Sequence, residues 1–393
     1  MSGWRPTRAV NLSAGCAALP LEVLEQAQRE FLGEEGPDAP GLSVAEMGYR
    51  TKNFYDVLSH CEDSFRKLMN IPDEYEVHFF NGGATLQFAA VPLNLCGGDH
   101  VKKANYVMSG HWSEKAAKEA RMMGIEVHEV CNDPKGLYFS HPPDEEWVFD
   151  KSARYVHYTA ADTRQGHEFQ DFPFHKVPEG QIVVADASAN LGSHDVDEAW
   201  WRKHGVVYAA AHKNFSTSGV CYTVIRKDLI PETVESVMRG TPTMCNWRRF
   251  QDAPGKIWTV PVVYSIWLGG LTTEWMRGKG GLKFFEDLAV RRSNILYNYI
   301  DDSSDGFYRT FVTDFKFRSR MQVVFTIRSG EGDDEQLVEK FLKETTDLGW
   351  LDIRSHPLGI SSSAIRVTMY NPQPVAVIEQ VRKFMVEFKE RNA

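Results

Sequence analysis

The chain has 393 residues, 42% of them apolar and 12% aromatic, which is enough for a large buried core and predicts two domains. The formal net charge of −9 argues against nucleic acid or an anionic membrane as the main partner, although a local basic pocket would still suit an anionic small molecule. No apolar stretch approaches the roughly 20 residues that a membrane-spanning helix needs, and the N-terminus lacks the apolar core of a signal peptide. We therefore expect a cytoplasmic location.

The first part of the chain alternates predicted helices and strands. Apolar residues at helical spacing predict helices over residues 21–32 and 54–69. A strand over residues 76–80 is followed by a Gly-Gly turn and by a helix that begins near Thr85. Further strands are predicted over residues 104–109, 126–130, 154–159, 181–186, 205–211 and 220–226, with a helix over residues 113–123. Strands that alternate with helices predict an α/β fold with a mostly parallel sheet covered by helices.

The pattern changes at about residues 272–282. A long predicted helix covers residues 283–300, and after it come a strand over 320–328, a helix over 334–348, strands over 351–355 and 364–370, and a helix over 374–391. This order is typical of a smaller α+β domain. We therefore predict an N-terminal arm (1–20), a large domain (21–272) and a small C-terminal domain (273–393).

Six cysteines are scattered along the chain without a CxxC pair or metal-type spacing. In a chain of this length they predict reduced thiols, mostly buried, and no metal site. They are Cys16, Cys61, Cys96, Cys131, Cys221 and Cys245.

Two polar residues stand where predicted strands of the large domain end. Asp186 ends the run QIVVAD, and Lys213 follows the run GVVYAAAH. One lysine and one aspartate at the ends of two apolar strands are typical of pyridoxal phosphate enzymes. In these enzymes the lysine forms the Schiff base and the acid binds the pyridinium nitrogen. The pair alone is a weak signal, because a lysine at a strand end is more often solvated and an aspartate there more often a cap.

Three further positions suit the same cofactor. The turn Gly82-Gly83-Ala84-Thr85 precedes a helix, so its N–H groups and the Thr85 hydroxyl fit a phosphate, although a tight turn alone would explain the glycines. Trp112 lies between a strand and a helix, where an indole can stack on a pyridine ring. His212 is next to Lys213 and can donate to the cofactor phosphate; simple core packing is the alternative for both side chains.

An ordered set of segments resembles the phosphoserine aminotransferase family, a group of class V aminotransferases. The likeness covers about residues 10–388 and includes the segments VNLSAGC, GLSVAEMGYRTKNFYDVL, FFNGGATLQFAAVPLNL, SGHWSEKAAKEA, VVADASANLGSHDV, YAAAHKNFSTSGV, RSRMQVVFTI and AIRVTMYNPQP. The resemblance implies a fold-type I pyridoxal phosphate enzyme that is a homodimer with active sites at the subunit interface. Enzymes of this family transfer the amino group of glutamate to 3-phosphohydroxypyruvate, giving O-phosphoserine and 2-oxoglutarate.

The resemblance also implies roles for individual residues. Lys213 corresponds to the Schiff-base lysine, Asp186 to the pyridinium partner and Trp112 to the stacking aromatic residue. Arg366 is expected to bind the substrate α-carboxylate, a bidentate task that suits a guanidinium. The other implied cofactor contacts are Ala84 and Thr85 at the phosphate, Thr163 at the ring hydroxyl, His212 in place of the usual glutamine, and Thr259, which reaches the neighbouring subunit's cofactor phosphate.

The substrate-phosphate residues match the family less well. Where the family has Ser-His-Arg this chain has Gly48-Tyr49-Arg50, and where the family has His-Arg it has His356-Pro357. Each place keeps one phosphate-binding residue, Arg50 or His356, and loses another. Losing one charged hydrogen bond costs about 1.5–3 kcal/mol, so two losses weaken the recognition of a phosphate substantially unless other residues compensate.

The leading prediction is therefore transamination between O-phospho-L-serine and 2-oxoglutarate, with small amino and 2-oxo acids as the only partners besides a second subunit. The first alternative keeps this chemistry but uses another 3-substituted 2-oxo acid, because of Tyr49 and Pro357. A class V lyase or desulfurase is a second alternative, since those enzymes share the His212-Lys213 pair. An inactive homologue retained for binding is the third.

Overall fold

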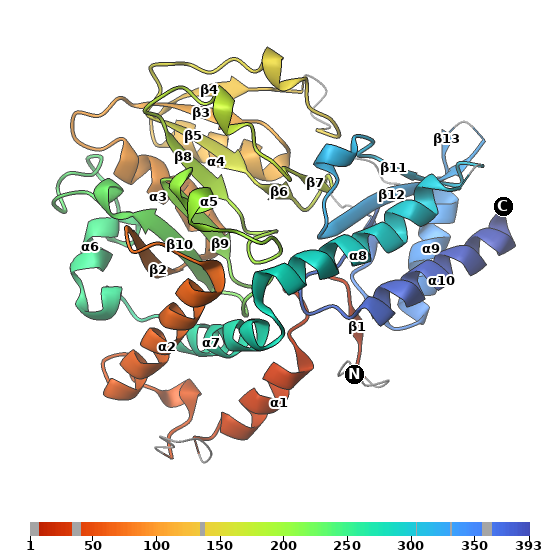
Figure 1. The fold of residues 1–393 in the computed structure, drawn as a ribbon, viewed down its shortest axis with the longest axis horizontal. Coiled ribbons are helices and arrows are strands. Elements are labelled where there is room, and N and C mark those ends of the chain that lie inside the picture. Colours follow the sequence, from red (N-terminus) through yellow and green to blue (C-terminus); the bar gives the residue numbers. More distant parts are fainter. Residues whose placement is uncertain (1–7, 34–40, 134–137, 304, 331, 356–363) are drawn as a thin grey trace.

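The computed structural model describes residues 8–33, 41–133, 138–303, 305–330, 332–355 and 364–393 (Figure 1). A seven-stranded sheet forms the centre of its larger part. The strand order is β2 (Tyr75–Asn81), β10 (Val220–Arg226), β9 (Val206–Ala210), β8 (Ile182–Asp186), β5 (Tyr155–Thr159), β3 (Lys103–Val107) and β4 (Glu126–Val130). Within this sheet β10 runs antiparallel to both neighbours and the other pairs are parallel, so the predicted mostly parallel sheet is confirmed.

Both faces of this sheet are buried. In β8, Val183 and Ala185 pack into one apolar cluster, whereas Ile182 and Val184 pack into another, as the two-residue period of a strand requires. The first cluster contains residues of α2 (Lys52–Met69) and α7 (Val263–Gly278), and the second contains residues of α3 (Gly83–Leu95) and α4 (His111–Met122). Burial on both faces explains why the central strands β8 and β9 are nearly continuous apolar runs in the sequence.

A smaller sheet follows α8 (Gly281–Asp301), which lies beside α10 (Val375–Asn392) in Figure 1. Its strands are all antiparallel, in the order β11, β12, β16, β15, with β13 paired to β12. The bounds are β11 Tyr308–Thr310, β12 Gln322–Ser329, β13 Gly332–Asp333, α9 Glu335–Asp347, β15 Arg354–Ser355 and β16 Ile365–Thr368. Residues of α8, α9 and α10 and of this sheet share one apolar core, as expected for the predicted small α+β part.

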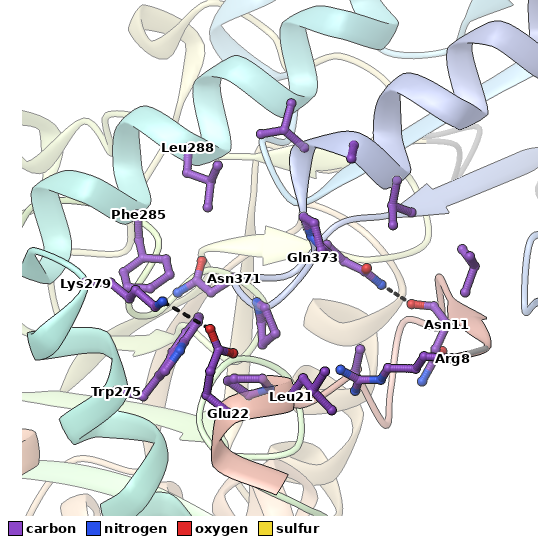
Figure 2. A pocket seen from close by; sticks show the side chains of 18 of the residues that line it. Arg8, Asn11, Leu21, Glu22, Trp275, Lys279, Phe285, Leu288, Asn371 and Gln373 are labelled. Carbon is purple, nitrogen blue, oxygen red and sulfur yellow. Dashed lines mark hydrogen bonds and ion pairs between the residues drawn. The ribbon is translucent and has the colours of Figure 1, made fainter. Parts of the chain in front are cut away.

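The N-terminal arm lies between the two parts. Its strand β1 (Val10–Asn11) pairs with β14 (Trp350–Leu351), and α1 (Leu21–Glu30) packs against α7. Figure 2 shows the cavity of about 380 Å³ where the arm, α7, α8 and the chain before α10 meet. The Gln373 amide donates to the Asn11 carbonyl of the arm, and Lys279 lies 3.1 Å from Glu22 of α1, so both the arm and the helix after it are bonded to residues around this cavity.

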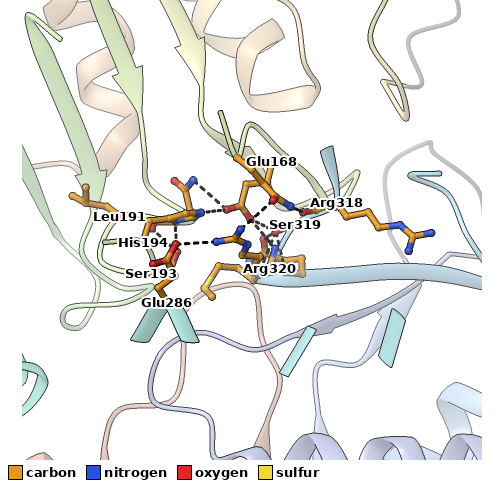
Figure 3. A network of polar contacts seen from close by, with 12 residues as sticks. Glu168, Leu191, Ser193, His194, Glu286, Arg318, Ser319 and Arg320 are labelled. Atoms are coloured by element: carbon orange, nitrogen blue, oxygen red, sulfur yellow. Dashed lines mark hydrogen bonds and ion pairs between the residues drawn. The ribbon is translucent and has the colours of Figure 1, made fainter. Parts of the chain in front are cut away.

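A buried carboxylate connects the two parts directly. Glu168, in β7 (His167–Glu168), is fully buried and accepts hydrogen bonds from the Ser319 hydroxyl (2.9 Å) and the Arg320 N–H (2.8 Å), which precede β12 (Figure 3). The Nε2 atom of His194 lies 2.8 Å from its other oxygen. This group of residues, Glu168, His194, Ser319 and Arg320, is called the Glu168 junction below.

Besides short elements that were not predicted, such as α5 (Glu198–Arg202) and α6 (Trp247–Asp252), the structure differs from the predictions in three main places. Helix α7 was not predicted, and the expected domain boundary at residue 272 falls inside it; the domain division itself stays a prediction. The single strand expected over residues 351–355 is two short strands, β14 and β15. Helix α3 begins at Gly83 rather than near Thr85.

Two further observations concern the described residues only. No helix in them has the length and hydropathy needed to cross a membrane, and no cluster of His, Cys, Asp and Glu side chains there could hold a metal ion. All six cysteines are free thiols, and four of them are buried.

Candidate active site

A cavity of about 620 Å³ lies at the carboxyl ends of the parallel strands. Asp186 is the last residue of β8, Lys213 follows β9, and the Gly82-Gly83 turn follows β2. Because parallel strands end at the same edge of a sheet, residues far apart in the sequence meet there. This cavity is called the strand-end cavity below. Eight of the site residues predicted from the sequence line it: Ala84, Thr85, Trp112, Thr163, Asp186, His212, Lys213 and Arg366.

Lys213 is almost fully buried, with 9% of its surface exposed. Burial lowers the pKa of its amine, and the nearby Arg366 guanidinium lowers it further, whereas Asp186 and Asp162 oppose this change. A lowered pKa increases the fraction of neutral amine at pH 7, and the neutral amine is the nucleophilic form. Lys213 is therefore placed to attack a carbonyl carbon in the cavity.

Asp186 is the buried carboxylate of the site, with 4% exposure. Burial raises its pKa, and Lys213 and Ser188 counteract that rise. Its Oδ1 atom accepts the Ser188 N–H at 3.0 Å, and the Ser188 hydroxyl in turn accepts the Ala210 N–H of β9 at 3.0 Å. A buried carboxylate with so few donors is stabilised by a cationic partner, and a protonated pyridine nitrogen meets that need.

The turn before α3 suits an anion. Gly82 has a φ of 96° and Gly83 a φ of 62°, so both lie in the left-handed region that favours glycine. A Cβ atom added at Gly83 would meet no other atom within 4 Å, so open space lies beside the helix N-terminus. Backbone N–H groups and the positive end of α3 therefore point toward space that a phosphate can occupy.

Trp112 is fixed by residues of the β6–β7 hairpin, in which β6 is Ala161–Asp162. The indole Nε1 donates to the Thr163 hydroxyl at 3.2 Å, and the Trp112 N–H donates to Asp162 Oδ2 at 2.9 Å. The Asp162 carboxylate is fully buried, and burial raises its pKa although the N–H groups of Trp112 and Arg164 oppose the rise. These bonds hold the indole over the cavity with little freedom.

His212 packs against the N-terminal arm. Burial lowers its pKa to about 4, with a further contribution from Lys213, so the imidazole is neutral at pH 7. A Cβ atom at Gly15 would lie only 2.8 Å from the His212 ring, and the Ala17 N–H donates to the His212 carbonyl at 2.9 Å. The arm therefore closes one side of the cavity.

Among the described residues, three of the predicted site residues do not line this cavity. Tyr49 and Arg50 contact each other, with the guanidinium 5.1 Å from the ring centroid, and Thr259 lies between the exposed residues Trp258 and Val260. His356 lies outside the described residues. The roles that the family resemblance implies for these four stay predictions.

Three further residues in or beside the cavity were not predicted as site residues from the sequence. Arg164 lines it directly, Asp162 holds Trp112, and Ser188 donates to Asp186. The available signal was the polar group Asp162-Thr163-Arg164 directly after a buried strand, of which only Thr163 was singled out.

The strand-end cavity has the features expected of a pyridoxal phosphate-dependent enzyme of fold-type I. They are a buried lysine, a buried carboxylate, a glycine turn at a helix N-terminus and a fixed indole, all at one edge of the sheet. The family model described as aminotransferase class-V matches residues 9–348. The chain is 38% identical to the phosphoserine aminotransferase of Hahella chejuensis, covering 98% of this chain and 99% of that protein.

Solved structures agree with this match. The phosphoserine aminotransferase of Bacillus circulans subsp. alkalophilus superposes with a TM-score of 0.87 at 31% identity, over 98% of this chain and 99% of that one. A pyridoxal phosphate-bound phosphoserine aminotransferase from Trichomonas vaginalis gives a TM-score of 0.86 at 29% identity, over 96% and 100% of the two chains.

The chain belongs to the phosphoserine aminotransferase family of class-V aminotransferases, which confirms the resemblance seen in the ordered motifs. It is a transaminase with pyridoxal phosphate as its cofactor, rather than a lyase, a desulfurase or an inactive homologue.

Proposed function

We propose that this enzyme transfers an amino group between O-phospho-L-serine and 2-oxoglutarate, as a step of serine biosynthesis. The observation that carries the proposal is that Lys213, Asp186 and Arg366 line one cavity, in a chain that matches phosphoserine aminotransferases over almost its whole length. Its substrates are then small amino and 2-oxo acids. The acidic net charge and the lack of a membrane-spanning helix in the described residues are consistent with a cytoplasmic enzyme.

The residues that line the strand-end cavity support a set of cofactor contacts. Lys213 would hold the cofactor covalently, Asp186 would keep the pyridine nitrogen protonated, and Trp112 would lie against the ring. Bound pyridoxal phosphate supplies the electron sink that weakens the Cα–H bond of the amino acid. The phosphate and ring-hydroxyl contacts are Ala84 and Thr85 at the start of α3, His212 through a ring N–H, and Thr163 at the ring hydroxyl.

Two residues then act on the substrate. The neutral amine of Lys213 would take the proton from Cα of the substrate and hold it on Nζ, a role that its lowered pKa favours. Arg366 binds the α-carboxylate and so holds the Cα–H bond in line for this transfer. Its Nη1 atom donates to the Thr163 carbonyl at 3.2 Å, a bond that orients the guanidinium.

We also propose a homodimer in which Tyr49, Arg50 and Thr259 act in the neighbouring subunit's cavity. Support comes from their position outside the cavity of their own chain. Trp258 and Val260, on either side of Thr259, are 46% and 63% exposed, and exposed apolar side chains of this kind are typical of interfaces. Sedimentation equilibrium of the holoenzyme tests the dimer; a monomer at assay concentrations would contradict it.

The experiment that tests the substrate is a spectral titration of the purified holoenzyme. We expect O-phospho-L-serine at low concentration to remove the visible absorption band of the bound cofactor, as glutamate does, while alanine and serine act weakly. The opposite result, in which glutamate removes the band and phosphoserine does not, would mean an aminotransferase for another 3-substituted 2-oxo acid. Tyr49→His together with Pro357→Arg would then be the substitutions to restore phosphoserine.

A further inference from the structure

We propose that Arg164 binds the distal anionic group of the substrate, the phosphate of phosphoserine or the γ-carboxylate of glutamate, in the cavity where Arg366 takes the α-carboxylate. This inference rests on the proposed function and adds a specificity-determining residue to it. It also supplies a cationic group in a chain whose sequence has Tyr49 and Pro357 at two positions where the family has phosphate-binding residues.

Arg164 is carried by a rigid hairpin. Strands β6 and β7 pair through Asp162 and His167, and the Gly166 N–H donates to the Asp162 carbonyl at 3.1 Å across the turn. The Arg164 N–H donates to Asp162 Oδ1 at 2.8 Å, an Asx-type turn that fixes the start of the loop. On its other side the Ser319 N–H donates to the Gly166 carbonyl at 2.9 Å. The backbone that presents Arg164 therefore does not need to be ordered when a ligand binds.

Arg164 lines the cavity and forms no ion pair with another described residue. Two carboxylates are near enough to affect it, but both are already engaged. Asp162 accepts the N–H groups of Trp112 and Arg164, and Glu114 accepts the Tyr138 hydroxyl at 3.0 Å. A partly buried guanidinium with no counter-ion is costly unless a ligand supplies the anion.

Arg366 lies near enough to Arg164 for the two positive charges to repel each other. Burial is the main reason that the pKa of Arg164 is lowered, and Arg366 adds to the effect. Two cations that face one cavity fit a ligand with two anionic groups, because each group then neutralises one guanidinium. Phosphoserine, glutamate and 2-oxoglutarate all have this dianionic form, whereas alanine and serine have a single carboxylate.

An equilibrium measurement isolates this contact from catalysis. Glutarate and valerate have the same five-carbon chain and differ in one terminal carboxylate. We measure the dissociation constants of both for the holoenzyme and for its Arg164→Gln, Arg164→Lys and Arg121→Gln variants. Arg121 is the matched control, since it forms an exposed ion pair with Glu129 in the same domain.

We expect the wild type to bind glutarate more tightly than valerate. Arg164→Gln should raise the dissociation constant of glutarate by about 10- to 100-fold and leave that of valerate unchanged. Arg164→Lys should recover part of the preference, and Arg121→Gln should behave as wild type. An unchanged glutarate-to-valerate ratio in Arg164→Gln, or an equal loss for both ligands, would overturn the proposal.

A kinetic arm distinguishes the two distal groups. Single-turnover loss of the visible band is measured with O-phospho-L-serine, glutamate and alanine, and Arg164→Gln is expected to slow the first two at low concentration but not alanine. Equal slowing of all three overturns the assignment of Arg164 to the distal group. A wild type that reacts with glutamate and not with phosphoserine contradicts the proposed substrate, yet the glutamate-to-alanine comparison still tests Arg164.

Discussion

At the scale of single residues, the site places two charges where a protein core normally excludes them. Lys213 and Asp186 are both buried. Burial lowers the pKa of Lys213 and raises that of Asp186, and both shifts favour the neutral form of the side chain. Each charge is nevertheless supported by the other, because the Coulomb interaction between them opposes both shifts. In the proposed function, a pyridine nitrogen beside Asp186 would replace this support once Lys213 held the cofactor.

A substitution of Asp186 tests this arrangement. Asp186→Asn removes the charge that holds the pyridine nitrogen, and the loss of one charged hydrogen bond costs about 1.5–3 kcal/mol. We expect the dissociation constant of pyridoxal phosphate to rise about 10- to 100-fold, as measured by equilibrium dialysis. Asp171→Asn, at an exposed carboxylate of the same domain, serves as the control. Unchanged cofactor affinity in Asp186→Asn would remove Asp186 from the site.

At the scale of elements, the sequence predicted the strands of the large sheet and the residues at their ends better than it predicted the helices. Strands β8, β9 and β10 are mostly apolar because both faces of the sheet are buried there, and the residues at their ends could be found from these apolar segments alone. Helix α7 could not be found in this way. Its residues are apolar around most of the helix and include Gly269 and Gly270, which lie against Tyr222 and His60, so neither periodicity nor composition marked it.

The site was predictable to the same extent. Lys213, Asp186 and the Gly82-Gly83 turn stand at strand ends, where position in the sequence implies position in space. Arg164 and Asp162 lie in a hairpin whose place over the cavity depends on contacts with β12, and such tertiary contacts leave no pattern in one sequence. Ser188 was missed because an Asp-x-Ser turn is equally common away from functional sites.

The loop before α4 gives a prediction at this scale. Gly110 has a φ of 147°, and a Cβ atom there would lie 2.6 Å from Asp162 Oδ2. Since Asp162 is fully buried and also holds Trp112, it has no free direction in which to move. Gly110→Ala should therefore lower the free energy of unfolding by about 1–3 kcal/mol more than Gly180→Ala, and should also weaken cofactor binding.

Gly180 is the matched control for this comparison, because its φ of 83° causes backbone strain while its added Cβ would meet nothing within 4 Å. Urea unfolding of the two variants measures the difference. Equal destabilisation by both substitutions would mean that the clash with Asp162 is relieved by small movements.

At the scale of the whole molecule, the Glu168 junction links β7 of the larger part to the residues that precede β12 in the smaller part (Figure 3). Burial by itself would raise the pKa of Glu168, but His194, the Arg320 N–H and the Ser319 hydroxyl together hold it below its ordinary value. Because the folded protein has the lower pKa, the stabilisation is present above the unfolded-state pKa and is lost as the pH falls through the folded one.

The junction therefore makes a pH-dependent prediction. Glu168→Gln should lower the free energy of unfolding by about 1.5–3 kcal/mol at pH 6, and this difference from wild type should shrink as the pH falls below about 4. Chemical unfolding across this pH range measures it, with Glu179→Gln at an exposed site as the control. A difference that stays constant down to pH 3 would show that the charge of Glu168 plays no part.

The central claim is that the strand-end cavity is the active site and that Lys213 holds the cofactor in it. The most direct measurement is reduction of the holoenzyme with borohydride, which fixes the cofactor to its lysine, followed by peptide mass spectrometry. We predict the pyridoxyl mass on the peptide that contains Lys213, and no such modification or visible band in Lys213→Ala, which should also lose transamination. Attachment to a different lysine, or a Lys213→Ala variant with full transamination, would contradict the account.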